Sequence, residues 1–205
     1  MQLLQGPILS YAEQLAGGSV FRNEICSQTA MRFPVSEPSS LLGVHVDGVA
    51  TGQTTEPDSV TLLISILLTP HRDRSCGATA IRSGSHREIA SAANAMEGVI
   101  SGGMVAERIS SLSHEGMDYV LGEPGDVFFG VWPLLHSATT VAIAEPRCAV
   151  FFRLMHVDHD PQRNVRDPFA DLPALRRRYG RAGWFRQRRD AEERRGSDPR
   201  ARAGR

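Results

Sequence analysis

The fold class is decided by one stretch, GDVFFGVWPLLHSATTVAIAEPRCAVFFRLMHV, residues 125–157. It contains two apolar runs rich in aromatic and β-branched residues, 126–132 and 148–157, and a turn with Gly or Pro precedes each run. Short runs of this composition between turns are typical of β-strands. The stretch therefore predicts two strands of a β protein.

The same pattern extends toward the N-terminus. Further short runs between turns lie at 29–33, 41–46, 59–68, 78–82 and 119–121. Several short strands with turns between them favour a sandwich or jelly roll. Helical spacing of apolar residues predicts a short helix within 1–17, and a polar insertion rich in Ala, Gly and Ser at 87–117 indicates a helix and a loop.

The 205 residues have zero net charge, but the charge is uneven along the chain. All 23 basic residues are Arg, with 8 against 15 acids in residues 1–152 and 15 against 8 acids in residues 153–205. The absence of Lys excludes Schiff-base chemistry and a Walker-type phosphate loop. We predict one domain over 1–170 and an Arg-rich helix with a disordered tail over 171–205.

Location and compartment are predicted from what the chain lacks. Three cysteines without a CxxC pair argue against a disulfide framework and a zinc knuckle. The N-terminal 15 residues lack the basic start and long apolar core of a signal peptide. The most apolar run, 60–69, is about half the length that spans a bilayer. We predict a cytoplasmic protein without a membrane partner, and the sequence gives no indication of its oligomeric state.

His-x-Asp occurs three times, and the first copy, residues 45–47, has the best context for a metal ion. Side chains alternate along a strand, so His45 and Asp47 share one face. The copy at 71–73 lies among arginines and indicates a solvated loop. The copy at 156–158 has no third ligand nearby except the histidine that follows it.

His136 is the candidate third ligand. Two histidines and one carboxylate on one side of an ion leave its other side open, which is the facial arrangement of non-haem Fe(II) oxygenases. Arg147 follows eleven residues later, and a hairpin would place it on a strand next to that of His136. Its planar guanidinium suits a dicarboxylate held by the metal. The structural alternatives are that His136 only ends a strand and that Arg147 pairs with Glu145.

Six motifs follow one another over residues 26–157: SQTAMRFP, GVHVDG, CGATAIRSGSHREI, GEPGDVFF, LLHSAT and EPRCAVFFRL. In this order they resemble the phytanoyl-CoA dioxygenase (PhyH) family of Fe(II)/2-oxoglutarate-dependent oxygenases. The resemblance implies a mainly β fold, a double-stranded β-helix (a cupin-like jelly roll) with a few flanking helices. It also implies Fe(II) bound by His45, Asp47 and His136, and Arg147 as the anchor for the far carboxylate of 2-oxoglutarate.

The resemblance extends to the cosubstrate and to the reaction. It places Gln28 near 2-oxoglutarate. Many family members have a serine two residues after the distal histidine; here that position is Ala138, and Thr139 and Thr140 are the candidate substitutes. Related halogenases lack the carboxylate of Asp47, so hydroxylation or desaturation is favoured. Fe(II), 2-oxoglutarate and O2 would oxidise a small-molecule substrate, acyl-CoA or carrier-bound compounds included, and yield succinate and CO2. The candidates for the substrate pocket are Thr79, Arg82 and Trp132.

Two alternatives from other functional classes stay open. Only 44 residues precede the first His-x-Asp, fewer than in most of the family, which leaves a cupin-like metal-binding protein without catalytic activity. The arginines of the tail alternate with Tyr179, Trp184 and Phe185, which leaves a binding module for a nucleic acid or an acidic carrier protein. Composition favours a solvated, disordered tail over nucleic-acid binding.

Overall fold

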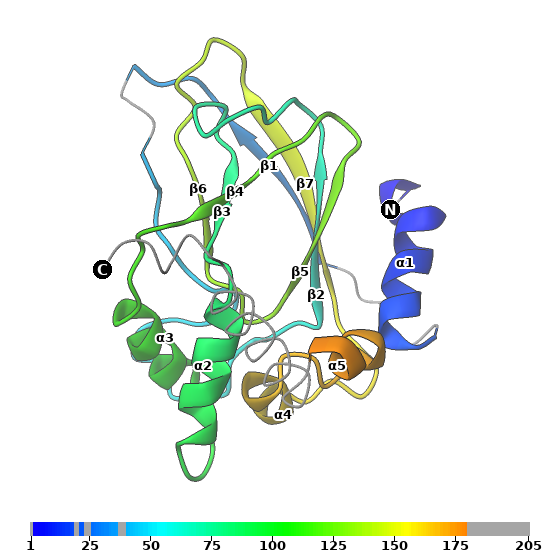
Figure 1. The fold of residues 1–205 in the computed structure, drawn as a ribbon, viewed down its shortest axis with the longest axis vertical. Coiled ribbons are helices and arrows are strands. Elements are labelled where there is room, and N and C mark those ends of the chain that lie inside the picture. The colour runs from blue at the N-terminus through cyan, green and yellow to red at the C-terminus, as the bar shows by residue number, and fades with distance from the viewer. Residues whose placement is uncertain (1, 19–20, 23–25, 37–39, 180–205) are drawn as a thin grey trace, which may run out of the picture.

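The computed structural model describes residues 2–18, 21–22, 26–36 and 40–179. Within them, the strands form two antiparallel sheets that face each other (Figure 1). The four-stranded sheet has the order β1 (Cys26–Arg32), β7 (Arg147–Leu154), β2 (Leu62–Leu67), β5 (Val127–Val131). The three-stranded sheet has the order β4 (Asp118–Val120), β3 (Thr79–Ile81), β6 (His136–Ala138). The expected mainly β class with flanking helices is confirmed, and closure into a double-stranded β-helix stays a prediction.

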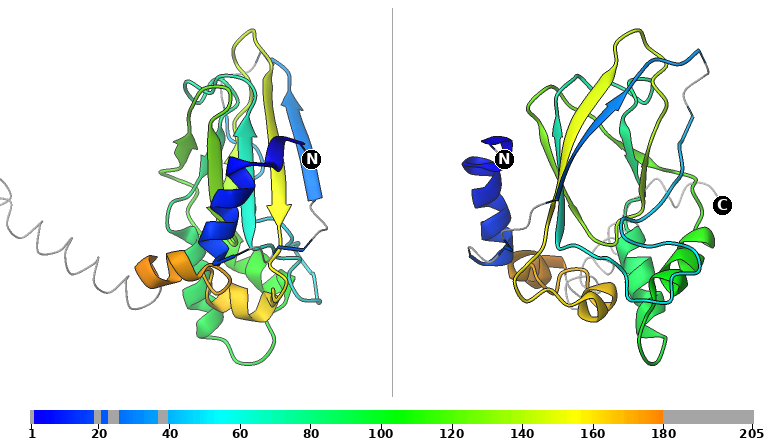
Figure 2. Two further views of the ribbon diagram at one scale, coloured as in Figure 1. Left: turned by 90° about the vertical axis from the view of Figure 1, so that its right-hand side faces the viewer. Right: turned by 180° about the vertical axis from the view of Figure 1, so that it is seen from behind.

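Helices cover one sheet and close one end of the molecule. After a 3-10 turn, η1 (Gln2–Leu4), helix α1 (Pro7–Ala16) lies along the outer face of the four-stranded sheet. The other helices gather at one end of the two sheets, as both views in Figure 2 show. They are α2 (Ser85–Asn94), α3 (Gly102–Ser110), α4 (Pro161–Arg166) and α5 (Pro173–Tyr179). None of the described helices is long and apolar enough to span a membrane.

The alternation of side chains along β2 and β7 separates the main core from the site. Ile64 and Phe152 belong to a buried cluster with residues of η1 and α1 on the outer face. Leu63 and Phe151 point to the opposite face, where they line a pocket between the sheets. Burying the outer face against α1 thus leaves the inner face of the same strands available for a ligand.

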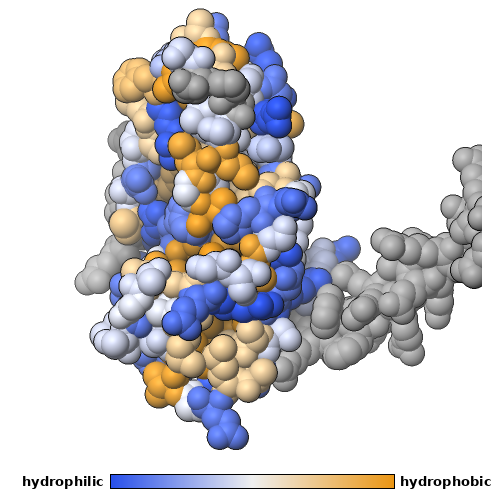
Figure 3. Space-filling view, turned by 90° about the vertical axis from the view of Figure 1, so that its left-hand side faces the viewer, coloured by the Kyte–Doolittle hydropathy of each residue, from blue (hydrophilic) through white to orange (hydrophobic). Residues whose placement is uncertain are grey.

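The helices at the end of the sheets form a second buried cluster. Ile89 and Val105, from α2 and α3, pack there with Val46, Trp132 and Leu135. Val46 separates His45 from Asp47 in the sequence and is 2% exposed. The expected alternation of an apolar residue with two polar ones is therefore present at this point of the chain. On the face drawn in Figure 3, a strip of apolar side chains runs between hydrophilic ones.

The expected strand at 41–46 is wrong as a regular strand. This segment pairs with the region of β6 only through two isolated bridges, Leu41 with Thr139 and His45 with His136. Three residues separate the bridges on one side and two on the other, so the pairing shifts by one residue between them. An extra residue on one strand interrupts a ladder in the manner of a β-bulge.

The C-terminal part is described only as far as Tyr179. Within the predicted Arg-rich helix and tail at 171–205, the structure has a helix at Pro173–Tyr179, and residues 180–205 lie outside the described part. Leu172 is fully buried in the same cluster as α1. The domain boundary near residue 170 stays a prediction.

Candidate metal centre

Pairing of two backbone segments brings the two histidines together. His45 and His136 form a bridge in which each backbone N–H donates to the carbonyl of the other residue at 2.9 Å. Residues directly opposite in antiparallel pairing place their side chains on the same face. The centroids of the two imidazole rings are accordingly only 4.5 Å apart.

Asp47 joins the histidines because it lies two residues after His45 and a turn follows it at once. Gly48 adopts φ +73°, and a Cβ atom at this position would lie 1.9 Å from the carbonyl oxygen of Asp58. Only glycine fits such a turn. The indole N–H of Trp132 donates to the Asp47 carbonyl at 2.8 Å and holds its main chain from the other side.

Backbone carbonyls orient both imidazoles. The Nδ1 of His45 lies 2.9 Å from the carbonyl of Gly43, and the Nδ1 of His136 lies 2.9 Å from that of Leu134. Each ring therefore donates through Nδ1 and keeps the lone pair of Nε2 for another partner. Both Nε2 atoms face the Asp47 carboxylate, where Oδ1 is 3.7 Å from His45 and 3.8 Å from His136.

These three side chains are the group of described residues that could hold one metal ion. Their ligand atoms lie within 4.8 Å of one another. With metal–ligand bonds of about 2.0–2.2 Å, two ligands of one ion are at most about 4.4 Å apart. The two distances from Asp47 to the histidines fall inside that limit, so the donor set fits a metal ion.

The protonation of Asp47 and His136 also suits a cation. Burial opposes ionisation of Asp47, but His45 and Arg153 outweigh it and hold the pKa of this carboxyl well below its usual range. Burial lowers the pKa of His136, whereas the contact with Asp47 raises the pKa of the more exposed His45. An anionic carboxylate and a neutral imidazole are the forms that bind metals.

Arg147 reaches the same site from the other sheet. The expected hairpin between the strands of His136 and Arg147 is wrong, because β6 and β7 belong to different sheets and the intervening chain crosses from one to the other. Both residues nevertheless line one polar pocket. Arg147 is 2% exposed, its NH2 group donates to the Thr79 hydroxyl at 3.0 Å, and its guanidinium lies 5.4 Å from the ring centroid of Phe151.

The guanidinium of Arg147 has unused hydrogen-bonding capacity. Its Nε atom is buried without a hydrogen-bond partner, and no carboxylate among the described residues pairs with it, Glu145 included. Burial lowers the pKa of Arg147 to about 10. A buried cation without a counter-ion is costly in free energy unless a ligand supplies the anion.

The polar pocket contains two of the expected cosubstrate residues, Gln28 and Arg147. Gln28 and Thr79 line it together with Ala138. The structure does not bring Thr139 into it. Instead, the Thr139 hydroxyl donates to the backbone carbonyl of Arg74 at 2.5 Å.

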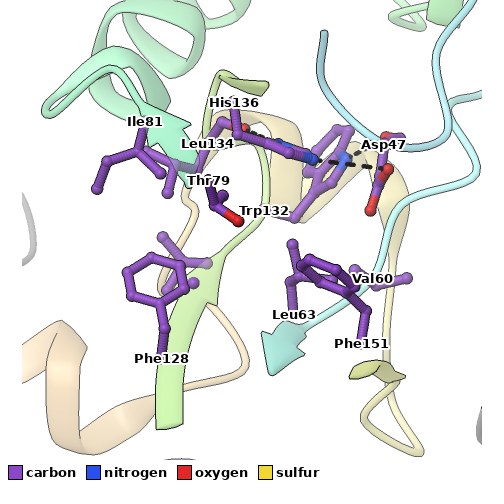
Figure 4. Close-up of a pocket in the computed structure, with 12 residues that line it drawn as sticks. Asp47, Val60, Leu63, Thr79, Ile81, Phe128, Trp132, Leu134, His136 and Phe151 are labelled. Carbon is purple, nitrogen blue, oxygen red and sulfur yellow. Dashed lines mark hydrogen bonds and ion pairs between the residues drawn. The ribbon is translucent and has the colours of Figure 1, made fainter. Parts of the chain in front are cut away.

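An apolar pocket adjoins the polar one and shares the Asp47–His136 side of it. Figure 4 shows these two residues across the pocket from Leu63, Phe128 and Phe151. Of the expected substrate residues, Trp132 and Thr79 line this pocket. Arg82 does not, because its guanidinium pairs with Glu88 of α2 at 2.9 Å.

Sequence reasoning missed Arg153. Its Nε donates to Oδ2 of Asp47 at 2.9 Å, and its NH1 and NH2 groups lie 3.3 Å from the side-chain oxygen of Gln28. Arg153 follows Arg147 by six residues on β7, and this even spacing placed both on one face of the strand. This even spacing was the feature of the sequence that could have placed Arg153 near the site. No pattern in the sequence indicates the contact of Arg153 with Asp47, which lies 106 residues away.

His71 also departs from expectation. The second His-x-Asp copy was expected in a solvated loop, but His71 is fully buried. Its backbone pairs with Gly122 through two hydrogen bonds of 2.8 and 3.0 Å, which draw the segment inward against the three-stranded sheet. Arginines next to a histidine in the sequence therefore do not predict that the histidine is exposed.

Comparison with solved structures finds the same fold in non-haem enzymes. The carbocyclase SnoK from nogalamycin biosynthesis, described as non-heme and alpha-ketoglutarate dependent, matches with TM-score 0.51 and 19% identity over 76% of this chain and 57% of SnoK. The epimerase SnoN, described in the same terms, matches with TM-score 0.50 and 17% identity over 76% of this chain and 56% of SnoN. EvdO2 from Micromonospora carbonacea var. aurantiaca matches with TM-score 0.50 and 14% identity over 79% and 67%.

These likenesses establish the fold. The chain spans little more than half the length of SnoK and SnoN. No protein-family model matches the sequence, and no curated protein is similar to it. The chain thus shares its fold with SnoK and SnoN, and its described residues include a His-Asp-His group that could bind a metal.

Proposed function

We propose that this chain is a non-haem Fe(II)/2-oxoglutarate-dependent dioxygenase that hydroxylates or desaturates a small-molecule substrate. One observation carries the proposal: the group of His45, Asp47 and His136 lies on the wall of a pocket that also contains the guanidinium of Arg147, which has no carboxylate partner among the described residues. A metal-chelating ligand with a distant carboxylate matches that combination. The likeness to SnoK and SnoN supports the same kind of chemistry.

Different residues would bind the metal ion and the cosubstrate. His45, Asp47 and His136 would hold Fe(II), and Arg147 with Thr79 would hold the far carboxylate of 2-oxoglutarate in the polar pocket. Bound iron supplies the activation of O2 that converts 2-oxoglutarate to succinate and CO2 and oxidises the substrate. The adjoining apolar pocket would exclude water and receive an apolar part of the substrate.

The site leaves the identity of the product to experiment. SnoK and SnoN, as a carbocyclase and an epimerase, show that this fold carries out more than oxygen insertion. Product mass separates the outcomes, because hydroxylation adds an oxygen atom, desaturation removes a pair of hydrogens and epimerisation leaves the mass unchanged. Whether the substrate is an acyl-CoA, a carrier-bound compound or a free molecule is decided by the same assay with candidate substrates.

Succinate formation tests the proposal. The purified chain with Fe(II), 2-oxoglutarate and air should produce succinate, with or without substrate, and Asp47→Ala should not. Arg72→Gln is a matched control, because Arg72 is an exposed arginine whose contact with Glu123 spans 3.6 Å. Metal binding without succinate formation would support the metal-binding protein without activity, and loss of activity on deletion of 186–205 would support a role for the tail.

A further inference from the structure

Arg32 lies directly opposite Arg147 in the sheet. The pairing of β1 with β7 runs from Cys26 with Arg153 to Arg32 with Arg147, with Gln28 opposite Phe151. Even spacing along β1 puts Gln28 and Arg32 on the inner face, and both line the polar pocket. The two arginines therefore line one pocket from directly opposite positions at the ends of neighbouring strands.

Among the residues that the structure describes, nothing compensates this pair of cations. Within the described part of the chain, no carboxylate forms an ion pair with Arg32 or Arg147. The acidic residue of the pocket, Asp47, is held by Arg153 at 2.9 Å. The Nε atoms of Arg32 and Arg147 are both buried without a hydrogen-bond partner.

Such an arrangement costs stability in the absence of a ligand. Like charges directly opposite each other on neighbouring strands repel, and burial strengthens the repulsion. The effect is visible on Arg147, because burial first and then the charge of Arg32 lower its pKa to about 10. The protein thus maintains an unfavourable pair of charges at a position where a bound anion would relieve it.

We propose that Arg32 and Arg147 together bind the far carboxylate of a dicarboxylate ligand, with Arg32 as the second anchor of the cosubstrate. A carboxylate offers two oxygens with about four acceptor positions, enough for two guanidinium forks. Arg147 is fixed by Thr79 and Phe151, whereas Arg32 is only half-buried and closes the site from the edge strand β1. This inference rests on the proposed function.

The proposal predicts opposite effects of one substitution on stability and binding. Arg32→Gln removes the repulsion, so the melting temperature of the ligand-free protein should stay equal to that of the wild type or rise. The same variant should bind 2-oxoglutarate about tenfold or more weakly, because it loses a hydrogen bond between charged groups. A merely structural arginine would lower the melting temperature on removal. Arg32→Lys keeps the charge and should recover part of the affinity.

The experiment measures binding to the full chain without turnover. The wild type, Arg32→Gln, Arg32→Lys and the control Arg72→Gln are loaded anaerobically with Fe(II) and titrated calorimetrically with 2-oxoglutarate, and melting is followed in parallel. A second titration uses 2-oxobutyrate, which has the same chelating end but no far carboxylate. The expected result is a loss for Arg32→Gln with 2-oxoglutarate and equal, weak binding of 2-oxobutyrate by all four proteins.

Three results would overturn the inference. Equal 2-oxoglutarate affinity in wild type and Arg32→Gln would remove Arg32 from the site while leaving the proposed function intact. A lower melting temperature together with weaker binding of both oxoacids would make Arg32 a structural residue. Failure of the wild type to bind 2-oxoglutarate at all would instead overturn the proposed function, and the inference with it.

Discussion

Two clusters place histidine against aspartate, and they differ in what they leave for a ligand. His159 has Nδ1 2.7 Å from Asp171 and Nε2 2.8 Å from the Ser59 hydroxyl, so both ring nitrogens have protein partners. The side chains of His159 and Asp171 are 2% and 1% exposed. In the metal centre, His45 has a 54% exposed side chain and an Nε2 directed at Asp47.

The difference shows that residue types alone do not define a site. Ser59, His159 and Asp171 have the contacts of a hydrolase triad, but Ser59 is 1% exposed and out of reach of a substrate. The Asp171 carboxylate also accepts hydrogen bonds from Asn164 at 2.5 Å and from Arg163 at 2.5 Å. This cluster ties the segment around α4 to the chain before β2, whereas the metal centre keeps unused lone pairs beside a pocket.

The largest expected loss of stability is that of Asp171→Ala, which disrupts the cluster of His159 and Asp171. It leaves buried donors without their acceptor, so the free energy of unfolding should fall by about 3–5 kcal/mol. Urea unfolding measures the loss. Fe(II) affinity of the folded fraction should equal that of the wild type. A parallel loss of Fe(II) affinity would mean that the two clusters are not independent.

Asp47→Ala should weaken metal binding strongly and change the stability of the fold only slightly. Removing a ligand should weaken Fe(II) binding by more than about 100-fold, beyond the 10–100-fold typical of residues that only orient a ligand. The free energy of unfolding should change much less than for Asp171→Ala, because Asp47 lies beside a pocket. Anaerobic Fe(II) titration gives the affinity, with the exposed Glu97→Ala as the control. Unchanged affinity would disprove the ligand set.

Arg153→Met sharpens the comparison within the metal centre. Arg153 holds Oδ2 of Asp47, so its removal frees the carboxylate to rotate, and Fe(II) affinity should fall by about 10–100-fold. Arg153→Lys keeps a cation and should lose less. The same Fe(II) titration measures both variants. Equal affinities for the wild type and Arg153→Met would show that the histidine contacts alone orient Asp47.

His71 extends the comparison to a buried imidazole outside both clusters. Neither ring nitrogen has a partner among the described residues, and burial, with Arg147 nearby, lowers its pKa to about 4. The unfolded chain takes up this proton near pH 6.5. Stability is therefore complete above about pH 6.5 and falls as the pH drops toward about 4, by at most about 1.4 kcal/mol per pH unit.

Urea unfolding between about pH 7 and about pH 4.5 checks this slope. Burial likewise lowers the pKa of His86 to about 4, so His71→Leu should remove only part of the slope. His114→Leu, at an exposed position, should leave it unchanged. A slope identical in wild type and His71→Leu would show that His71 does not remain neutral in the folded protein.

Local patterns in the sequence predicted the strands and part of the site. Turns and β-branched runs located β2, β5 and β7 to within a few residues, and parity placed His45 with Asp47. What failed depended on partners distant in sequence. The register shift opposite Thr139, the crossing of Arg147 to the other sheet and the bond from Arg153 to Asp47 arise from pairings that no local pattern encodes.

The most direct test of the metal centre is an anaerobic titration with Fe(II) and then 2-oxoglutarate, followed by visible absorption. Simultaneous chelation of 2-oxoglutarate by iron at His45, Asp47 and His136 produces a metal-to-ligand charge-transfer band. We predict this band in the wild type only when both components are present, and none in Asp47→Ala. Absence of the band in the wild type, or an equal band in Asp47→Ala, would contradict the account.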